Sequence, residues 1–190
     1  MTGTARRRGW RQDEPPPAGA AAQDVEPDPE SVARSIALRL LTGAPRSRSQ
    51  LAEAMARRNV PEDVADRVLD RFTEVGLVDD ADYARTLVRT RHAERGLSRR
   101  AIAVELRRRG IADDVAGEAL TEVDEDDEEE AARALVRRRL ASTAGLDPQV
   151  RARRTYAALG RKGYPPGLVA RLVREALAEE GAEQGEVESV

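Results

Sequence analysis

Arginine is the residue type whose clustering in this chain points to chemistry. Between positions 85 and 109 there are nine arginines and only two acidic residues, Glu94 and Glu105, so the stretch carries a net charge of +7. A guanidinium group binds a phosphate or a carboxylate through two parallel hydrogen bonds. Arg85 and Arg89 are four residues apart and share one helical face, while further arginines open and close the next helix. Together they could form a basic surface for an anionic partner.

An acidic stretch follows and offers a simpler explanation for the same arginines. From Asp113 to Glu130 there are eleven acidic residues and no lysine or arginine. The basic surface could therefore be a solvated face that pairs with these neighbouring carboxylates. Ion pairs of this kind at the surface contribute little to the stability of the fold. A third possibility is that the acidic run 124–130 competes with DNA for the basic face. Charge alone leaves these interpretations open.

The residues that catalysis requires are scarce. His92 is the only histidine and lies in a polar segment that reads as a helix end, where it would be exposed or would interact with the helix dipole. No glycine pattern for binding a nucleotide phosphate occurs. The run Asp124 to Glu130 reads as a solvated helix start rather than a metal loop, and Asp79 reads as an N-cap. We expect a protein that is not an enzyme and needs no cofactor or metal.

Composition narrows the class of protein. Aromatic residues make up 3% of the 190 residues and charged residues 35%, so the core must be built from Leu, Val, Ile and Ala. The chain has no cysteine and therefore no disulfide framework. The basic start of the chain lacks the apolar run of a secretory signal, and no stretch approaches the roughly 20 apolar residues of a membrane span. We expect a soluble cytoplasmic monomer.

A repeated apolar pattern indicates how these residues are positioned. Five apolar positions recur as apolar residues 51 positions later, and again 53 positions further on with one polar exception, Thr155. The first set is Leu51, Met55, Val60, Val64 and Leu69. The second and third sets are Ile102, Leu106, Ile111, Val115 and Leu120, then Thr155, Leu159, Tyr164, Leu168 and Val173. Tyr164 and Tyr83 are expected to pack in the core. A unit this short cannot bury its own apolar stripe, so the copies should stack into an elongated array.

Caps and periodicity divide the chain into an all-α array of three three-helix repeats. Residues 1–30 are rich in proline, alanine and glycine and are expected to be a disordered tail. Repeats are expected at 31–76, 77–123 and 124–180, with a frayed acidic C-terminus at 181–190. The nine predicted helices span about 31–42, 47–58, 61–75, 79–94, 98–109, 112–122, 126–143, 148–162 and 165–179. Ser47 and Gln50 have the spacing of a capping box, and Pro61, Pro148 and Pro165 or Pro166 suit first turns. Glycines 76, 96, 110 and 163 suit helix ends.

Three stretches of the chain resemble the RecX regulatory proteins, which bind the RecA recombinase. The first is Ala37-Leu38-Arg39-Leu40-Leu41 followed by 46–51, the second is 76–84 (GLVDDADYA), and the third is 95–111 without 103–104 (RGLSRRAI and ELRRRGI). The resemblance covers about residues 31 to 178. The proline-rich tail and the acidic stretch 113–130 lie outside the common pattern of that family, so nothing is transferred to them.

The resemblance implies a helical repeat protein that lies in the groove of a RecA filament on DNA. Such proteins restrain filament growth and lower ATP hydrolysis, strand exchange and co-protease activity in DNA repair and the SOS response. The family has no catalytic residues. Charge clustering and matching motif positions together give the candidate contacts with the filament or its DNA: Arg85, Arg89, Arg99, Arg100, Arg107 and Arg108.

Two other interpretations remain open from the sequence. Three-helix units with arginine-bearing turns occur in helix-turn-helix proteins, so the chain could bind nucleic acid on its own, with an affinity that falls steeply as salt rises. The net charge of −3 disfavours that interpretation. The chain could also be a helical adaptor for another protein, which would leave recombinase ATPase activity unchanged. Weak contact with single- or double-stranded DNA is expected alongside binding to the RecA filament.

Overall fold

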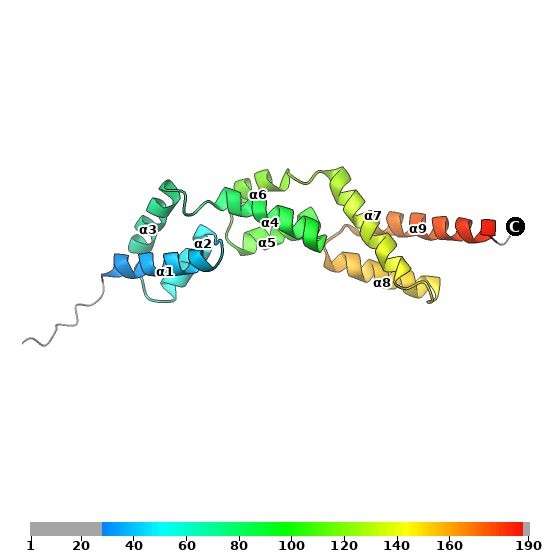
Figure 1. Ribbon diagram of the computed structural model, residues 1–190, viewed down its shortest axis with the longest axis horizontal. Helices are drawn as coiled ribbons and strands as arrows, with labels where there is room; N and C mark the ends of the chain where they lie inside the picture. The colour runs from blue at the N-terminus through cyan, green and yellow to red at the C-terminus, as the bar shows by residue number, and fades with distance from the viewer. Residues whose placement is uncertain (1–27, 188–190) are drawn as a thin grey trace, which may run out of the picture.

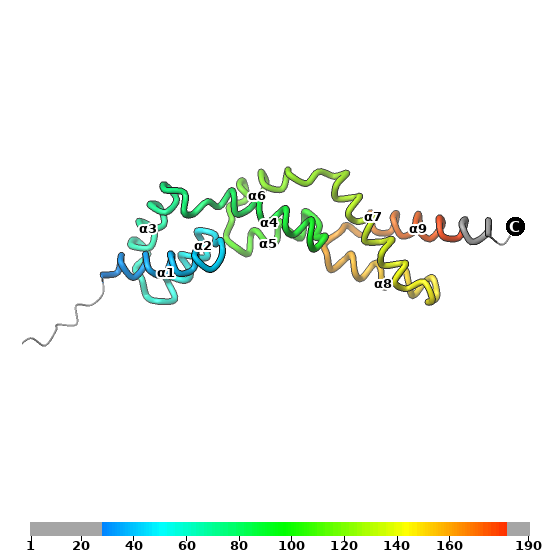
Figure 2. The backbone as a smooth tube through the Cα atoms, in the orientation of Figure 1, coloured from blue at the N-terminus to red at the C-terminus, as the bar shows by residue number. Residues whose placement is uncertain are grey.

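A computed structural model describes residues 28–187, with side chains described to position 181, and this part of the chain contains nine helices and no strand. The helices form three groups arranged in a row along the long axis of the molecule (Figure 1), and the backbone trace follows the same course (Figure 2). Every helix pair with extensive contact lies within one group. The groups are α1 (Pro29–Gly43), α2 (Arg48–Ala56) and α3 (Glu62–Glu74); α4 (Asp80–Arg95), α5 (Arg99–Arg108) and α6 (Asp113–Leu120); α7 (Glu125–Ala141), α8 (Pro148–Arg161) and α9 (Pro166–Val187).

Each repeat has its own hydrophobic core, so a single unit does bury its apolar stripe, and the expectation that this stripe requires stacking of the repeats was wrong. Leu51 and Met55 of α2, Ile102 and Leu106 of α5, and Leu159 of α8 are fully or almost fully buried. Thr155, the polar exception in the pattern, is also buried, and its hydroxyl donates a hydrogen bond of 2.9 Å to the carbonyl oxygen of Arg151. The core cluster of the first repeat includes Val78, which lies beyond the boundary predicted at 76.

The signals that start and stop the helices act largely as expected. The Ser47 capping box is formed, and Asp79 and Asp124 accept hydrogen bonds from backbone N–H groups of the first turns of α4 and α7. Gly96 ends α4 in the left-handed conformation, with φ of 55°. Gly110, which follows α5, is also left-handed with φ of 72°, and the corresponding position of the first repeat is Asn59, whose φ is 57°. Asparagine tolerates this conformation better than most residues.

Three predicted boundaries need correction. Helix α1 begins at Pro29, inside the expected tail, because Asp28 caps it and proline fits the first turn. Pro61 is the N-cap residue of α3 and precedes its first turn. Helix α9 continues through Gly181 to Val187, where fraying was expected, since one glycine does not end a helix unless the backbone turns there. Residues 1–27 and 188–190 lie outside the described part of the chain.

Neighbouring repeats contact each other at two joints that have the same arrangement. At the first joint the Ser47 hydroxyl donates to the carbonyl oxygen of Arg109 at 2.6 Å, and the backbone N–H of Arg48 donates to Asp80 at 2.8 Å. The N-terminus of α2 therefore contacts the C-terminal end of α5 and the N-terminus of α4.

The second joint repeats this arrangement one unit further along. The backbone N–H of Ser98 donates to the carbonyl oxygen of Lys162 at 3.0 Å, and that of Arg99 donates to Glu128 at 2.9 Å. The Lys162 ammonium group also donates to the carbonyl oxygen of Arg95. Both joints thus place the N-terminus of one repeat's second helix between a turn and a carboxylate of the next repeat.

Ser47→Ala should weaken the first joint. The hydroxyl of this fully buried residue accepts from the Gln50 N–H at 3.2 Å and donates to Arg109, so alanine loses both a cap and a contact between repeats. We expect the free energy of unfolding, measured by urea denaturation, to fall by about 2 kcal/mol. Ser35→Ala on the exposed face of α1 is the control and should leave stability unchanged or slightly higher. Equal stabilities for the two variants would mean that the joint contributes nothing.

Candidate binding surface of the middle repeat

The six candidate arginines lie on the first two helices of the middle repeat. Arg85 and Arg89 share one face of α4, while Arg99 and Arg100 form the first turn of α5. Arg107 and Arg108 form its last turn. Arg89, Arg100, Arg107 and Arg108 are exposed, and Arg85 and Arg99 are partly buried.

Four of these arginines lie on two different faces of the middle repeat, Arg85 and Arg89 on one and Arg100 and Arg107 on the other. Arg91 of α4 contacts Glu105 of α5, and Tyr83 of α4 contacts Arg109 beyond its end, so the Tyr83 and Arg91 side of α4 faces the second helix. Residues in a helix advance by roughly 100° each, so Arg85 and Arg89 lie on a different side of α4. On α5, Arg100 and Arg107 are seven residues apart and share one face.

Few of the six guanidinium groups are engaged within the described part of the chain. Arg85 lies 3.6 Å from Asp82, and Arg107 lies 3.4 Å from Asp113. Arg89, Arg99, Arg100 and Arg108 have no carboxylate within ion-pair distance among the described residues. Arg107 is thus the one candidate that pairs with the acidic stretch 113–130 through its side chain. The remaining side chains can bind anions of a partner.

Two arginines of the same basic stretch are instead part of the fold. Arg91 Nε donates to Glu105 Oε2 at 2.9 Å, and Arg109 Nη2 donates to Glu105 Oε1 at 2.6 Å. Arg109 also donates to the Tyr83 hydroxyl, and its guanidinium carbon lies 5.9 Å from the centre of the Tyr83 ring. The hydrogen bond from Arg91 is the main reason that the pKa of Glu105 lies below its ordinary value. This cluster fastens α4 to α5.

Glu105→Gln should loosen that contact in a pH-dependent way. The depressed pKa means that ionised Glu105 stabilises the fold above pH 4.5, and that this contribution is lost as pH falls through the depressed pKa. We expect the variant to be less stable by about 1 kcal/mol near neutral pH, because the group is only partly buried. The difference from the unmodified protein should vanish in acid when urea denaturation is followed across pH. A difference that did not change with pH would contradict this account.

The acidic run 124–130 is the start of a helix, as predicted. Asp124 caps α7 by accepting from the N–H of Asp127 at 2.7 Å, and Glu128 accepts from Arg99 at the second joint. Glu129 pairs with Arg171 and Arg133, and these hydrogen bonds lower its pKa to about 2. No group of three or more metal-ligating side chains gathers anywhere in residues 28–181. Whether the run competes with DNA for the basic face stays a prediction.

His92 and the two tyrosines lie where the sequence indicated. His92 is in the last turn of α4, partly buried, with Nδ1 3.3 Å from the carbonyl oxygen of Leu97. Tyr83 packs against the second core and Tyr164 lies in the third, where burial raises the pKa of the Tyr164 hydroxyl to about 12. Asp80 and Glu128 were not predicted as joint residues. Their one signal was an acidic residue in the first turn of each repeat's first helix.

The three repeats match three models of one protein family. Residues 33–72 match the first three-helix domain of RecX, residues 79–120 match the second, and residues 126–173 match the third. No helix in the described part of the chain combines the length and apolar character needed to cross a membrane.

Full-length relatives agree with the family models. The chain is 52% identical over 168 residues to a regulatory protein RecX of Thermobifida fusca, covering 88% of this chain and 89% of the relative. It is 49% identical over 166 residues to a regulatory protein RecX of Streptomyces coelicolor, with 86% and 88% covered. A third, from Mycobacterium marinum, is 45% identical over 167 residues, with 87% and 94% covered.

Solved structures share the fold. A crystal structure of RecX from Lactobacillus salivarius superimposes with a TM-score of 0.69 at 20% identity, covering 78% of this chain and 97% of that one. A second crystal structure, of a regulatory protein RecX, gives a TM-score of 0.66 at 23% identity, with 78% and 72% covered. At these identities the likeness concerns the three-repeat architecture.

Proposed function

Since the chain belongs to the RecX family of regulatory proteins, we propose that it binds RecA filaments assembled on DNA and restrains their activity. The restrained activities are filament growth, ATP hydrolysis, strand exchange and co-protease function, in DNA repair and the SOS response. The observation that carries the proposal is the match of all three repeats, in order, to the three domains of one regulatory family. We expect the protein to act as a monomer in the cytoplasm, without catalysis of its own.

The elongated array supports a preference for filaments over single RecA subunits. A filament presents the same surface at each subunit, and three repeats in a row can contact several subunits at once (Figure 1). After the first contact each further contact is effectively intramolecular, so weak individual contacts add up to strong binding. A free subunit offers one such contact and should bind much more weakly.

The arginines of the middle repeat supply suitable chemistry for this binding. Arg100 and Arg108 are exposed and have no carboxylate partner in the described structure, so binding an anion would not require an internal ion pair to break. The partner groups would be acidic side chains of RecA or phosphates of the DNA within the filament.

Co-sedimentation separates this proposal from independent binding to nucleic acid. We expect the protein to pellet with RecA filaments on single-stranded DNA, and to remain in the supernatant with RecA alone or with the same DNA alone at physiological salt. If it pelleted equally with bare DNA, and did so in a strongly salt-dependent way, the helix-turn-helix interpretation would replace the filament proposal.

A further inference from the structure

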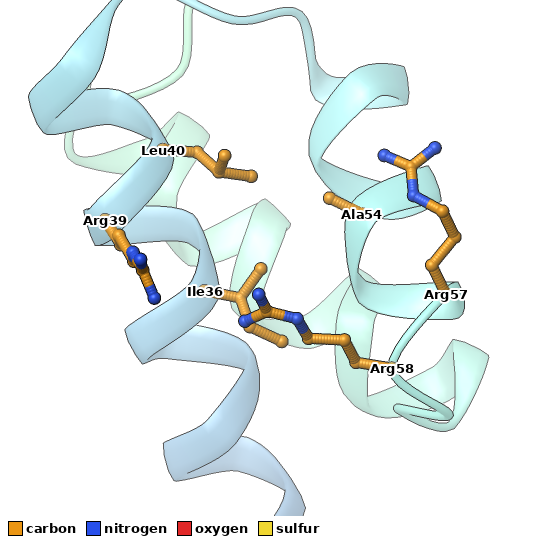
Figure 3. A pocket seen from close by; sticks show the side chains of 6 residues that line it. All are labelled: Ile36, Arg39, Leu40, Ala54, Arg57 and Arg58. Carbon is orange, nitrogen blue, oxygen red and sulfur yellow. The ribbon is translucent and has the colours of Figure 1, made fainter.

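A hollow lies between α1 and α2 of the first repeat, away from the candidate arginines of the middle repeat. Its volume is about 360 Å³, and Figure 3 shows the six residues that line it. Ile36, Leu40 and Ala54 form an apolar floor, and the Arg58 side chain reaches across the gap between the two helices. Arg39 and Arg57 flank it on either side, and none of the described residues that line it is acidic.

The arginines around this hollow are largely unengaged. Arg39 and Arg58 are exposed and have no carboxylate within ion-pair distance among the described residues. Arg57 pairs with Glu53 one helical turn earlier at 2.8 Å, but both side chains are more than 60% exposed, so that pair is weak. The hollow therefore combines positive charge with an apolar surface, and within residues 28–181 its arginines have only the exposed Glu53 as a counter-charge.

The middle repeat shows what fills the corresponding place. With the offset of 51 residues, Arg58 corresponds to Arg109 and Ala54 to Glu105. In the middle repeat the Glu105 carboxylate lies between Arg109 and Arg91, at 2.6 and 2.9 Å. In the first repeat Ala54 stands in place of this glutamate and Leu40 in place of Arg91, while Arg58 keeps the arginine of position 109. No described carboxylate occupies the position beside Arg58.

We infer that the hollow in the first repeat binds a carboxylate side chain of an acidic peptide segment of a partner protein. The carboxylate would pair with Arg58 as Glu105 pairs with Arg109, and a neighbouring apolar side chain of the peptide would cover Ile36, Leu40 and Ala54. This apolar floor favours a peptide over a phosphate backbone, which has no apolar group to place there. The site goes beyond the proposed function, which rests on the whole array and the middle repeat.

Ala54→Glu is the sharpest test because it supplies the missing carboxylate from within the chain. Residue 54 is four positions before Arg58, the same spacing that joins Glu105 to Arg109, so the variant should fold and block its own site. The probe is a fluorescein-labelled peptide that alternates leucine with aspartate or glutamate over twelve residues, and its binding to the full chain is followed by fluorescence anisotropy. A labelled oligothymidine of similar charge is the second probe.

The expected result is binding of the acidic peptide that falls about tenfold or more in Ala54→Glu and in Arg58→Glu. Ala54→Gln, which adds a similar volume without the charge, should keep most of the binding, and Arg67→Glu on α3 should keep most of it too. Circular dichroism of each variant checks that it is folded. The inference would be wrong if the peptide did not bind, or if Ala54→Glu bound it as well as Ala54→Gln. It would also be wrong if the variants weakened binding of the oligothymidine alone, since the site would then take phosphate.

Discussion

Gly163→Ala should open the joint between the second and third repeats. Gly163 has φ of 87°, a conformation that costs a residue with a side chain about 1–2 kcal/mol. An added Cβ would also lie 2.5 Å from Ser98 Oγ and 2.8 Å from Ala101 Cβ, across the joint. Because Ala101 cannot move its Cβ without moving α5, the two repeats must separate. We expect a total cost of about 2–4 kcal/mol at the joint.

Hydrogen exchange locates the effect of this change. The Ser98 N–H, which donates to Lys162 across the joint, should lose most of its protection, whereas amides in the core of the first repeat, such as that of Met55, should keep theirs. Gly160→Ala is a matched control three residues earlier, inside α8, where an added Cβ meets nothing within 4 Å. It should stabilise α8 by up to about 1 kcal/mol. Unchanged protection at Ser98 in Gly163→Ala would show that the joint does not depend on this glycine.

Reversing the charge of Arg100 and Arg107 together should impair the inhibition of RecA. Both residues lie exposed on one face of α5, and the double change turns two potential anion contacts into repulsions. We expect the concentration needed for half-inhibition of RecA ATPase activity to rise by about tenfold or more. Arg99 is left unchanged because its backbone N–H bonds Glu128, and a new carboxylate there would disturb the second joint.

Arg67→Glu combined with Arg71→Glu is the matched control for this variant. The pair lies on α3, makes the same change in net charge and likewise includes one arginine in a surface ion pair, Arg67 with Asp63. We expect this control to inhibit nearly as well as the unmodified protein. If both double variants lost inhibition equally, net charge rather than the α5 surface would govern binding, and the site assignment would fail.

Local rules explain why the helices and cores could be predicted from the sequence. The repeated apolar positions of α2, α5 and α8 are periodic within single helices, and caps such as Ser47 and Gly96 act on their own turns. The end of α9 was misplaced because Gly181 is a stop signal only when the backbone turns left-handed, which it does not do in this helix.

Contacts between helices could not be predicted in the same way. The basic stretch does not reveal that Arg109 is held by Glu105 and Tyr83 while Arg108 next to it is exposed, because that depends on how α4 and α5 are packed. The joints could not be predicted either, because Ser98 and Lys162 are far apart in sequence. They contact each other through backbone groups, which are the same in every residue. The aligned repeats show Ala54 at the position of Glu105. That this alanine removes a carboxylate beside Arg58 follows only from the contacts of Glu105 in the middle repeat.

The most direct test of the central claim is the rate of ATP hydrolysis by RecA on single-stranded DNA as this protein is titrated in, before and after filament assembly. We expect inhibition at well below one copy per RecA subunit, since one elongated array would affect several subunits of a filament. A difference between the two orders of addition would distinguish blocked growth of the filament end from binding along its groove. An ATPase rate that stayed constant in both orders of addition, with protein shown to be folded, would contradict the proposed restraint of RecA filaments.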